Sequence, residues 1–162
     1  MLKTTLFDFR KNVDIYQWRI VNDFVMGGVS KSKCFLKENS VLFQGSVSLE
    51  NNGGFAMVKY NFPKLDITSF SKIKISLKGD TKNYQVRFKE NNTQKHAYIQ
   101  EFKTTNDWQE VVFRLEDFVP MYRGKKMELT KFQDNSISEI GFLIGNKREE
   151  DFELQIKKIQ LL

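Results

Sequence analysis

The stretch WRIVNDFVMGGVS, residues 18–30, decides how the chain is organised. Apolar residues flank an Asn–Asp pair and a Gly–Gly pair, a pattern that predicts an irregular, tightly built segment leading into a strand. The two glycines allow backbone angles closed to other residues, while Asn22 and Asp23 can hydrogen-bond neighbouring amides. A second turn marked by glycines, NNGG at residues 51–54, follows two strand-like runs later. The sequence therefore predicts a β-rich domain with elaborate turns.

Length and composition favour one globular domain. A chain of 162 residues buries roughly two thirds of its unfolded surface on folding. Its 40% hydrophobic and 28% charged residues argue against disorder, and no apolar run approaches the roughly 20 residues of a membrane span. We expect a single domain over residues 1–162. With Cys34 as the only cysteine and no leader-like start, we expect a reducing compartment and cytoplasmic localisation.

The net charge of +6 suits a nucleic-acid-binding protein, but the distribution of the charge does not. Lysines alternate with apolar residues along residues 72–78, as on the solvated face of a strand. The other basic clusters, at residues 123–126, 147–148 and 157–158, are short and scattered. We therefore expect a solvated surface and no nucleic-acid partner.

Alternation of apolar and polar residues is the main structural signal. It predicts strands at residues 4–9, 29–37, 41–49, 54–62, 71–78, 84–90, 95–102, 108–115, 137–144 and 152–161. One helical turn is expected near residues 15–18, a hairpin-type turn at residues 51–54 and a loop at residues 116–133. Pro63 is expected to end the strand before it. About ten short strands without a long amphipathic helix predict an all-β protein, a single antiparallel β-sandwich.

Catalytic chemistry has little support in the sequence. His96 is the only histidine, so a Ser-His-Asp or Cys-His arrangement would need it, and no nucleophile-elbow pattern surrounds a serine. One histidine and one cysteine cannot form a tetrahedral metal site. Hydrolysis by two carboxylates stays open if Glu101 and Glu110 lie on neighbouring strands, although ion pairs with arginines are the simpler interpretation. We expect a non-catalytic protein without a cofactor.

A ligand platform is one interpretation of the outward strand faces. Arg87 and Trp108 should point outward, while the phase of residues 95–102 is ambiguous and exposes either Tyr98 or Ile99. Aromatic rings beside polar groups on an open sheet suit a saccharide, because the rings stack on C–H faces and the polar groups bond hydroxyls. Arg87, Tyr98 and Trp108 are therefore candidate binding residues. The alternative is a solvated face with cross-strand ion pairs.

Asp23 has three candidate roles. It could cap backbone amides, pair with Arg123, or contribute to a Ca²⁺ site, which normally needs six or more oxygen ligands. Capping or a salt bridge is favoured, and we expect Asp23 and Arg123 to lie within salt-bridge distance. Apart from this weak calcium candidate, we expect no metal site. Cys34, inside a predicted strand, should be a small buried residue.

Several motifs together resemble a known family. They lie at residues 21–30, 43–55, 79–84, 108–115, 118–124 and 140–144. The sequence resembles the complex I intermediate-associated protein 30 family over nearly its whole length. The resemblance implies a jelly-roll sandwich similar to galactose-binding domains and to some carbohydrate-binding modules. One departure is the loop at residues 146–151, which lacks the glycine often found there.

The resemblance also implies a class of function. Mitochondrial members of the family act as chaperones in the assembly of respiratory complex I, so we expect a binding or assembly module that holds a protein partner or a glycan. A lectin-like carbohydrate-binding domain is the alternative. The positions that match the family motifs, and would form any site it has, are Asn22, Asp23, Met26, Gly27, Gly28, Ser30, Asn51, Asn52, Gly53, Gly54, Arg123 and Gly124.

Overall fold

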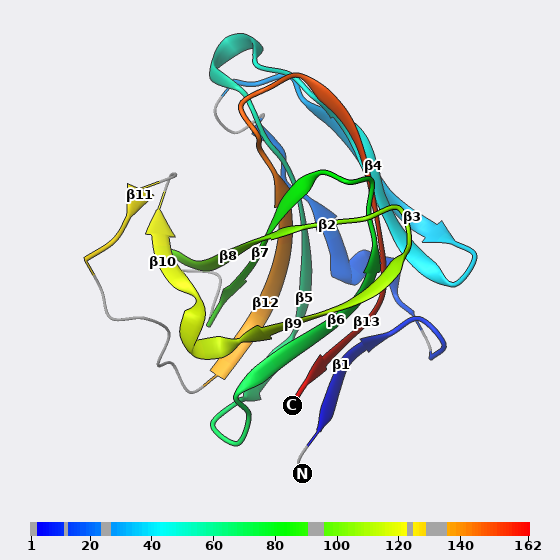
Figure 1. The fold of residues 1–162 in the computed structure, drawn as a ribbon, viewed down its shortest axis with the longest axis vertical. Coiled ribbons are helices and arrows are strands. Elements are labelled where there is room, and N and C mark those ends of the chain that lie inside the picture. Colours follow the sequence, from blue (N-terminus) through cyan, green and yellow to red (C-terminus); the bar gives the residue numbers. More distant parts are fainter. Residues whose placement is uncertain (1–2, 12, 24–26, 91–95, 123–124, 129–135) are drawn as a thin grey trace.

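The computed structural model describes residues 3–11, 13–23, 27–90, 96–122, 125–128 and 136–162. Its regular structure in these ranges is thirteen β-strands and short 3-10 turns, arranged as two antiparallel sheets (Figure 1). The prediction of an all-β sandwich is confirmed. Across the described residues, no helix has the length and apolar character required to cross a membrane.

Strands from both halves of the chain contribute to each sheet. The six-stranded sheet contains β1 (Thr4–Asp8), β3 (Lys31–Lys37), β4 (Ser40–Val47), β6 (Lys72–Lys78), β9 (Trp108–Arg114) and β13 (Glu150–Leu161). The seven-stranded sheet contains β2 (Trp18–Ile20), β5 (Ala56–Asp66), β7 (Asn83–Lys89), β8 (Ala97–Lys103), β10 (Val119–Tyr122), β11 (Lys125–Lys126) and β12 (Ser136–Ile144). The described 3-10 turns are η1 (Ile15–Gln17), η3 (Glu50–Asn52) and η4 (Leu115–Asp117).

Strand β13 organises the six-stranded sheet. Its first half pairs with β4 and its second half with β6, while β1 pairs with its last residues on the edge opposite β6. The first and last strands of the chain therefore lie side by side (Figure 1). Phe152, Leu154 and Ile156 are buried at every second position of β13, as expected for a strand with one face in the core.

The order of the seven-stranded sheet is β11-β10-β8-β7-β12-β5-β2. Strand β5 continues through Pro63 to Asp66, so the prediction that this proline ends the strand was wrong. The register between β5 and β12 shifts between Ile137 and Glu139, opposite the segment that contains Pro63. Proline is tolerated at such a bulge because the ladder there does not require its missing N–H donor.

The inner faces of the two sheets share one aromatic core. The rings of Phe88 and Phe118 pack in a tilted arrangement with centroids 4.2 Å apart, and Trp18 stacks on Tyr60 at 4.8 Å. All four side chains are buried. Large rings that meet in offset or edge-on geometry contribute more than their buried area alone, which explains how so many phenylalanines are accommodated.

The turn at residues 51–54 has a different role from the predicted one. It joins β4 of one sheet to β5 of the other, through η3, so it is a crossover and not a hairpin. Asn51 and Gly54 do adopt the positive φ angles, 54° and 137°, that their residue types favour. This crossover places the turn beside the segment that contains Asp23.

Candidate ligand-binding face

Asp23 joins three segments of the chain. Its side chain is fully buried, and its Oδ1 accepts a hydrogen bond from the Ser30 N–H at 3.1 Å. Its Oδ2 accepts from the Ser30 hydroxyl at 2.5 Å and from the Gly54 N–H at 2.8 Å. The Ser30 Oγ in turn accepts from the Ser48 N–H at 2.9 Å. We call Asn22, Asp23, Ser30 and Gly54 the Asp23 clamp.

Asn22 completes the Asp23 clamp from the neighbouring position. Its Oδ1 accepts from the Ser32 hydroxyl at 2.9 Å and from the Met57 N–H at 3.2 Å, and its Nδ2 donates to the Ser30 carbonyl at 3.3 Å. The two glycines of the motif have different roles. Gly27 adopts a positive φ of 86°, and a Cβ at Gly28 would overlap the Asp23 carboxyl group. These contacts hold the fold together.

The surroundings of Asp23 suit a structural carboxylate and not a cation ligand. Donors surround both oxygens, so a Ca²⁺ ion would meet N–H and O–H hydrogens instead of lone pairs. Burial raises the pKa of Asp23, but hydrogen bonds from Ser30, Gly54 and Phe55 outweigh it and hold the pKa below its usual value. Arg123 and the Asn52 side chain lie outside the described residues, and so does the predicted Asp23–Arg123 pair.

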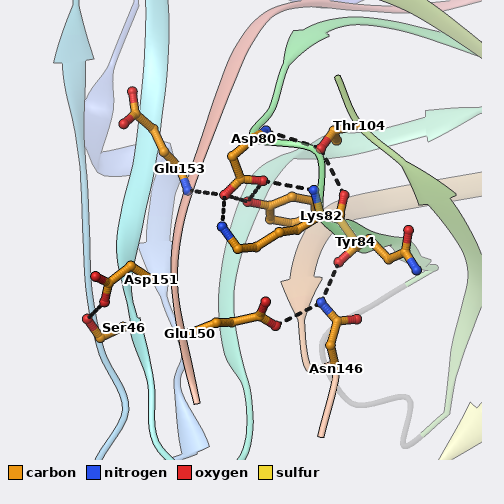
Figure 2. A network of polar contacts seen from close by, with 10 residues as sticks. Ser46, Asp80, Lys82, Tyr84, Thr104, Asn146, Glu150, Asp151 and Glu153 are labelled. Atoms are coloured by element: carbon orange, nitrogen blue, oxygen red, sulfur yellow. Dashed lines mark hydrogen bonds and ion pairs between the residues drawn. The ribbon is translucent and has the colours of Figure 1, made fainter. Parts of the chain in front are cut away.

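Asp80 forms a second polar contact between the sheets (Figure 2). Its carboxylate accepts from the Glu153 N–H of β13 at 2.8 Å, from the Tyr84 hydroxyl of β7 at 3.0 Å and from the Lys82 ammonium at 3.3 Å. Burial, and then the charge of Asp80, raises the pKa of Tyr84. The motif at residues 79–84 therefore also serves the fold.

The structure does not bring Arg87, Tyr98 and Trp108 together. Tyr98 is buried in the core with its ring 6.2 Å from Phe88, and Ile99 takes the outward position. Trp108 is 43% exposed on the outer face of the six-stranded sheet, and Arg87 lies on the outer face of the other sheet. A single platform built from all three residues is not formed.

Trp108 borders a hollow of about 380 Å³. The Lys157 ammonium lies 5.3 Å from the centre of its ring, a cation–π contact. Asp8 and Arg10 line the same hollow and are hydrogen-bonded to each other at 3.0 Å. This bond, against the opposing effect of burial, lowers the pKa of Asp8 to about 2. The hollow thus combines one aromatic ring with a fixed carboxylate–guanidinium pair.

A second candidate surface lies at the centre of the seven-stranded sheet. On the side of the sheet opposite the core, the outward residues of its middle strands β5, β12 and β7 form three rows in register. These residues are Met57, Lys59, Asn61, Gln85, Arg87, Lys89, Glu139, Gly141 and Leu143. We call them the Arg87 face. Met57, Glu139, Gly141 and Leu143 among them are buried, and the others are partly exposed. In its central row Lys59, Gly141 and Arg87 are direct neighbours, and the glycine leaves room between two long basic side chains.

The polar groups of the Arg87 face are only partly satisfied. The Lys59 ammonium lies 3.6 Å from the Glu139 carboxylate, and Arg87 Nη1 donates to the Met57 sulfur at 3.3 Å, a weak acceptor. The Arg87 Nε and the Asn61 Oδ1 are buried without a hydrogen-bond partner in the described part of the chain. Buried polar atoms of this kind are rare in folded proteins, so each requires an explanation.

Burial also acts on the charges of the Arg87 face. It lowers the pKa of Arg87, with a partial offset from the negative charge of Glu139. It lowers the pKa of Lys89 as well, and the neighbouring charge of Lys59 lowers it further. Water therefore solvates these cations less than it would on an open surface. The arrangement can hold an oxygen-rich ligand by hydrogen bonds.

The described residues form neither the carboxylate pair considered from the sequence nor a cluster of metal-binding side chains. Glu101 and Glu110 belong to different sheets, so the carboxylate pair considered above does not converge. No group of three or more His, Cys, Asp and Glu side chains in the described ranges could hold a metal ion.

The sequence model of the complex I intermediate-associated protein 30 family matches residues 7–156. The chain belongs to that family. No curated protein matches it. The family 11 carbohydrate-binding module of the cellulase Lic26A-Cel5E of Clostridium thermocellum has a similar fold, with a TM-score of 0.71, 16% identity and coverage of 99% of this chain and 94% of that one.

Two further solved structures have the same jelly-roll fold. The Clostridium thermocellum family 11 module in complex with a β-1,3-1,4-mixed-linked tetrasaccharide has a TM-score of 0.70 and 16% identity, with 99% of this chain and 95% of that chain covered. The agarase AgWH50C has a TM-score of 0.63 and 12% identity, and the match covers 98% of this chain but only 24% of that enzyme. The prediction of a jelly roll is confirmed.

Sequence reasoning identified Arg87 but missed its neighbours Lys59, Asn61 and Glu139. The available signal was Glu139 and Gly141 in a strand otherwise rich in apolar residues, since neither suits a buried position. In contrast, the family motif at residues 21–30 contributes Asn22, Asp23 and Ser30 to the Asp23 clamp and no residue to the Arg87 face.

Proposed function

We propose that residues 1–162 form a single non-catalytic binding module that holds a saccharide on the Arg87 face. The observation that carries this proposal is the set of partly exposed polar side chains on the central strands, Lys59, Asn61, Gln85, Arg87 and Lys89, in which Arg87 has only the Met57 sulfur as a hydrogen-bond acceptor in the described residues. Sugar hydroxyls both donate and accept hydrogen bonds, so a saccharide can bond the cations and the amides of this face together.

The position of the Arg87 face supports the same proposal. Its residues sit on the central strands of the sheet, where hydrogen bonds on both sides fix the backbone. A ligand bound there meets preorganised groups and spends little free energy on ordering them. The fold is shared with a module that was solved with a tetrasaccharide, which makes saccharides the first ligands to test.

A protein partner is the second candidate, and family membership is the observation that favours it. The family is described by its association with intermediates of complex I. Against this, the centre of the Arg87 face contains Lys59, Lys89 and Glu139, whereas the cores of protein interfaces are depleted in lysine and glutamate. We therefore place saccharide binding first.

The test is calorimetric titration of the full chain with neutral and acidic oligosaccharides, using β-1,3-1,4-glucan, agarose and uronate oligomers. Arg87→Gln and Trp108→Ala serve as a matched pair, because each alters one outer face. Saccharide binding that is lost in Arg87→Gln and retained in Trp108→Ala is the expected result. Binding that depends on Trp108 alone would move the site to the hollow on the six-stranded sheet. The absence of saccharide binding would favour the protein partner.

A further inference from the structure

The Arg87 face carries more positive than negative charge. Lys59, Arg87 and Lys89 share it with one carboxylate, that of Glu139, and Lys59 already pairs with that group at 3.6 Å. Arg87 and Lys89 make no ion pair within the described part of the chain. The next carboxylate, Glu101 on β8, is exposed to solvent one row away. The single carboxylate of Glu139 therefore faces three cations, which leaves the face with an excess of positive charge.

These cations are also poorly solvated. Arg87 and Lys89 are only partly exposed, and burial disfavours their charged forms. A ligand oxygen that carries negative charge would replace the lost solvation and accept from the Arg87 guanidinium, whose hydrogen-bond acceptor in the described residues is the Met57 sulfur. Charge-assisted bonds of this kind are stronger than bonds between neutral groups. A neutral ligand would leave the excess positive charge of the face in place.

We propose that the ligand of the Arg87 face is an acidic saccharide whose carboxylate or sulfate oxygens bind Arg87, with Lys89 as the second cation. This inference rests on the proposed function. The planar guanidinium presents parallel N–H donors that match two oxygens of one anionic group. Ring hydroxyls of the same ligand can bond the partly exposed amides of Asn61 and Gln85. Gly141 adds no side chain between Lys59 and Arg87, and a Cβ there would make van der Waals contacts with Lys59 and Met57.

The test compares ligands that differ in charge alone. The probes are oligomers of galacturonate, glucuronate and guluronate, their methyl esters, which keep the rings but remove the charge, and a sulfated galactan oligomer. The acids should bind at least about tenfold more tightly than the esters, and Arg87→Gln should weaken the acids by about 10- to 100-fold. Arg114→Gln removes an arginine from the opposite sheet and should change the affinity less than about twofold. Comparing the affinity for the uronate oligomers with that for the sulfated galactan oligomer shows whether the face prefers a carboxylate or a sulfate group.

A second measurement needs no variant. The side-chain N–H signal of Arg87 Nε, followed by nuclear magnetic resonance in the wild-type protein, should shift on addition of the acidic oligomer and not on addition of its ester. Gly141→Ala, which adds one methyl group to the floor of the face, should weaken binding without unfolding the protein.

Each other outcome overturns one or both proposals. Equal binding of acid and ester, still dependent on Arg87, would refute the acidic ligand and leave saccharide binding intact. If Arg114→Gln weakens the affinity for the acids as much as Arg87→Gln does, the binding reflects the overall positive charge of the protein. If the Arg87 Nε signal does not shift while the acid binds, the anionic group binds elsewhere. If neither acids nor neutral oligomers bind, the acidic ligand and the saccharide function fail together.

Discussion

Replacing Asp23 by alanine should strongly destabilise the protein. The substitution removes the acceptor of four hydrogen bonds, from the Ser30 N–H, the Ser30 hydroxyl, the Gly54 N–H and, at 3.4 Å, the Phe55 N–H. The hydroxyl can turn to the Ser48 carbonyl, which lies 3.3 Å away, so three N–H groups lose their acceptor. Each unsatisfied buried donor costs about 1–3 kcal/mol, which gives about 3–9 kcal/mol in total. Such a loss is comparable to the whole stability of a typical domain, about 5–15 kcal/mol.

Equilibrium unfolding in urea measures this loss. Asp151→Ala is the matched control, because it removes a carboxylate that accepts from Ser46 at 2.5 Å on the exposed surface, where water can replace it. The control should change the free energy of unfolding by about 0.5 kcal/mol or less. If Asp23→Ala does not fold, Asp23→Asn, which keeps one acceptor oxygen, should still fold with a lower midpoint.

Two results would refute the clamp. The first is a cost below about 1 kcal/mol for Asp23→Ala, which would mean that the three N–H groups find other partners. The second is a rise in melting temperature on addition of Ca²⁺ that disappears in Asp23→Asn. A ligand that binds only the folded state raises its stability by mass action, so that pattern would identify Asp23 as a cation ligand.

Three further predictions follow from the same contacts. Asp8 and Asp23 have pKa values below about 3.9, the unfolded value of aspartate, so their stabilisation should be present above pH 4 and lost as the pH falls through their folded-state pKa values, which for Asp8 is about 2; urea midpoints across this range measure it. Burial raises the pKa of Cys34 to about 12, so its thiol should react slowly with a disulfide reagent at pH 8 until the protein is unfolded, and rapid reaction of the native protein would contradict this. Gly28→Ala overlaps Asp23 and should cost about 1–3 kcal/mol in the same urea experiment, while Gly141→Ala should leave the midpoint unchanged.

The long strands of the fold were predictable from the sequence, and the short ones were not. Alternation over seven or more residues marks β6, β9 and β13, because each has one face in the core and one in water. Strands β2, β10 and β11 have two to four residues, too few to show a period, and were predicted as irregular. Strand β2 pairs with β5 and β10 pairs with β8, both distant in the sequence, and β11 then pairs with β10.

The candidate site was harder to predict than the fold. The Arg87 face combines β5, β12 and β7, whose residues meet only through the registers of two ladders. The alternation of apolar and polar residues predicts that Arg87 points outward. It does not show that Lys59 and Gly141 lie in the same row of the sheet. Three members of the Asp23 clamp, Asn22, Asp23 and Ser30, were found because they lie close together in the sequence. The fourth, Gly54, is distant in the sequence, and its contact with Asp23 depends on the fold.

The separation of the Asp23 clamp from the Arg87 face has a consequence that can be measured. Asp23 holds backbone segments together, whereas the Arg87 side chain extends from a strand whose pairing does not require it. Arg87→Gln removes a half-buried charge that has no ion pair in the described residues, so it should leave the urea midpoint unchanged or raise it, while ligand affinity falls. Asp23→Asn should lower the midpoint and leave the affinity of the folded fraction unchanged. A variant set in which stability and affinity always fall together would show that the clamp and the face are one coupled unit, and would refute the division of roles proposed for this fold.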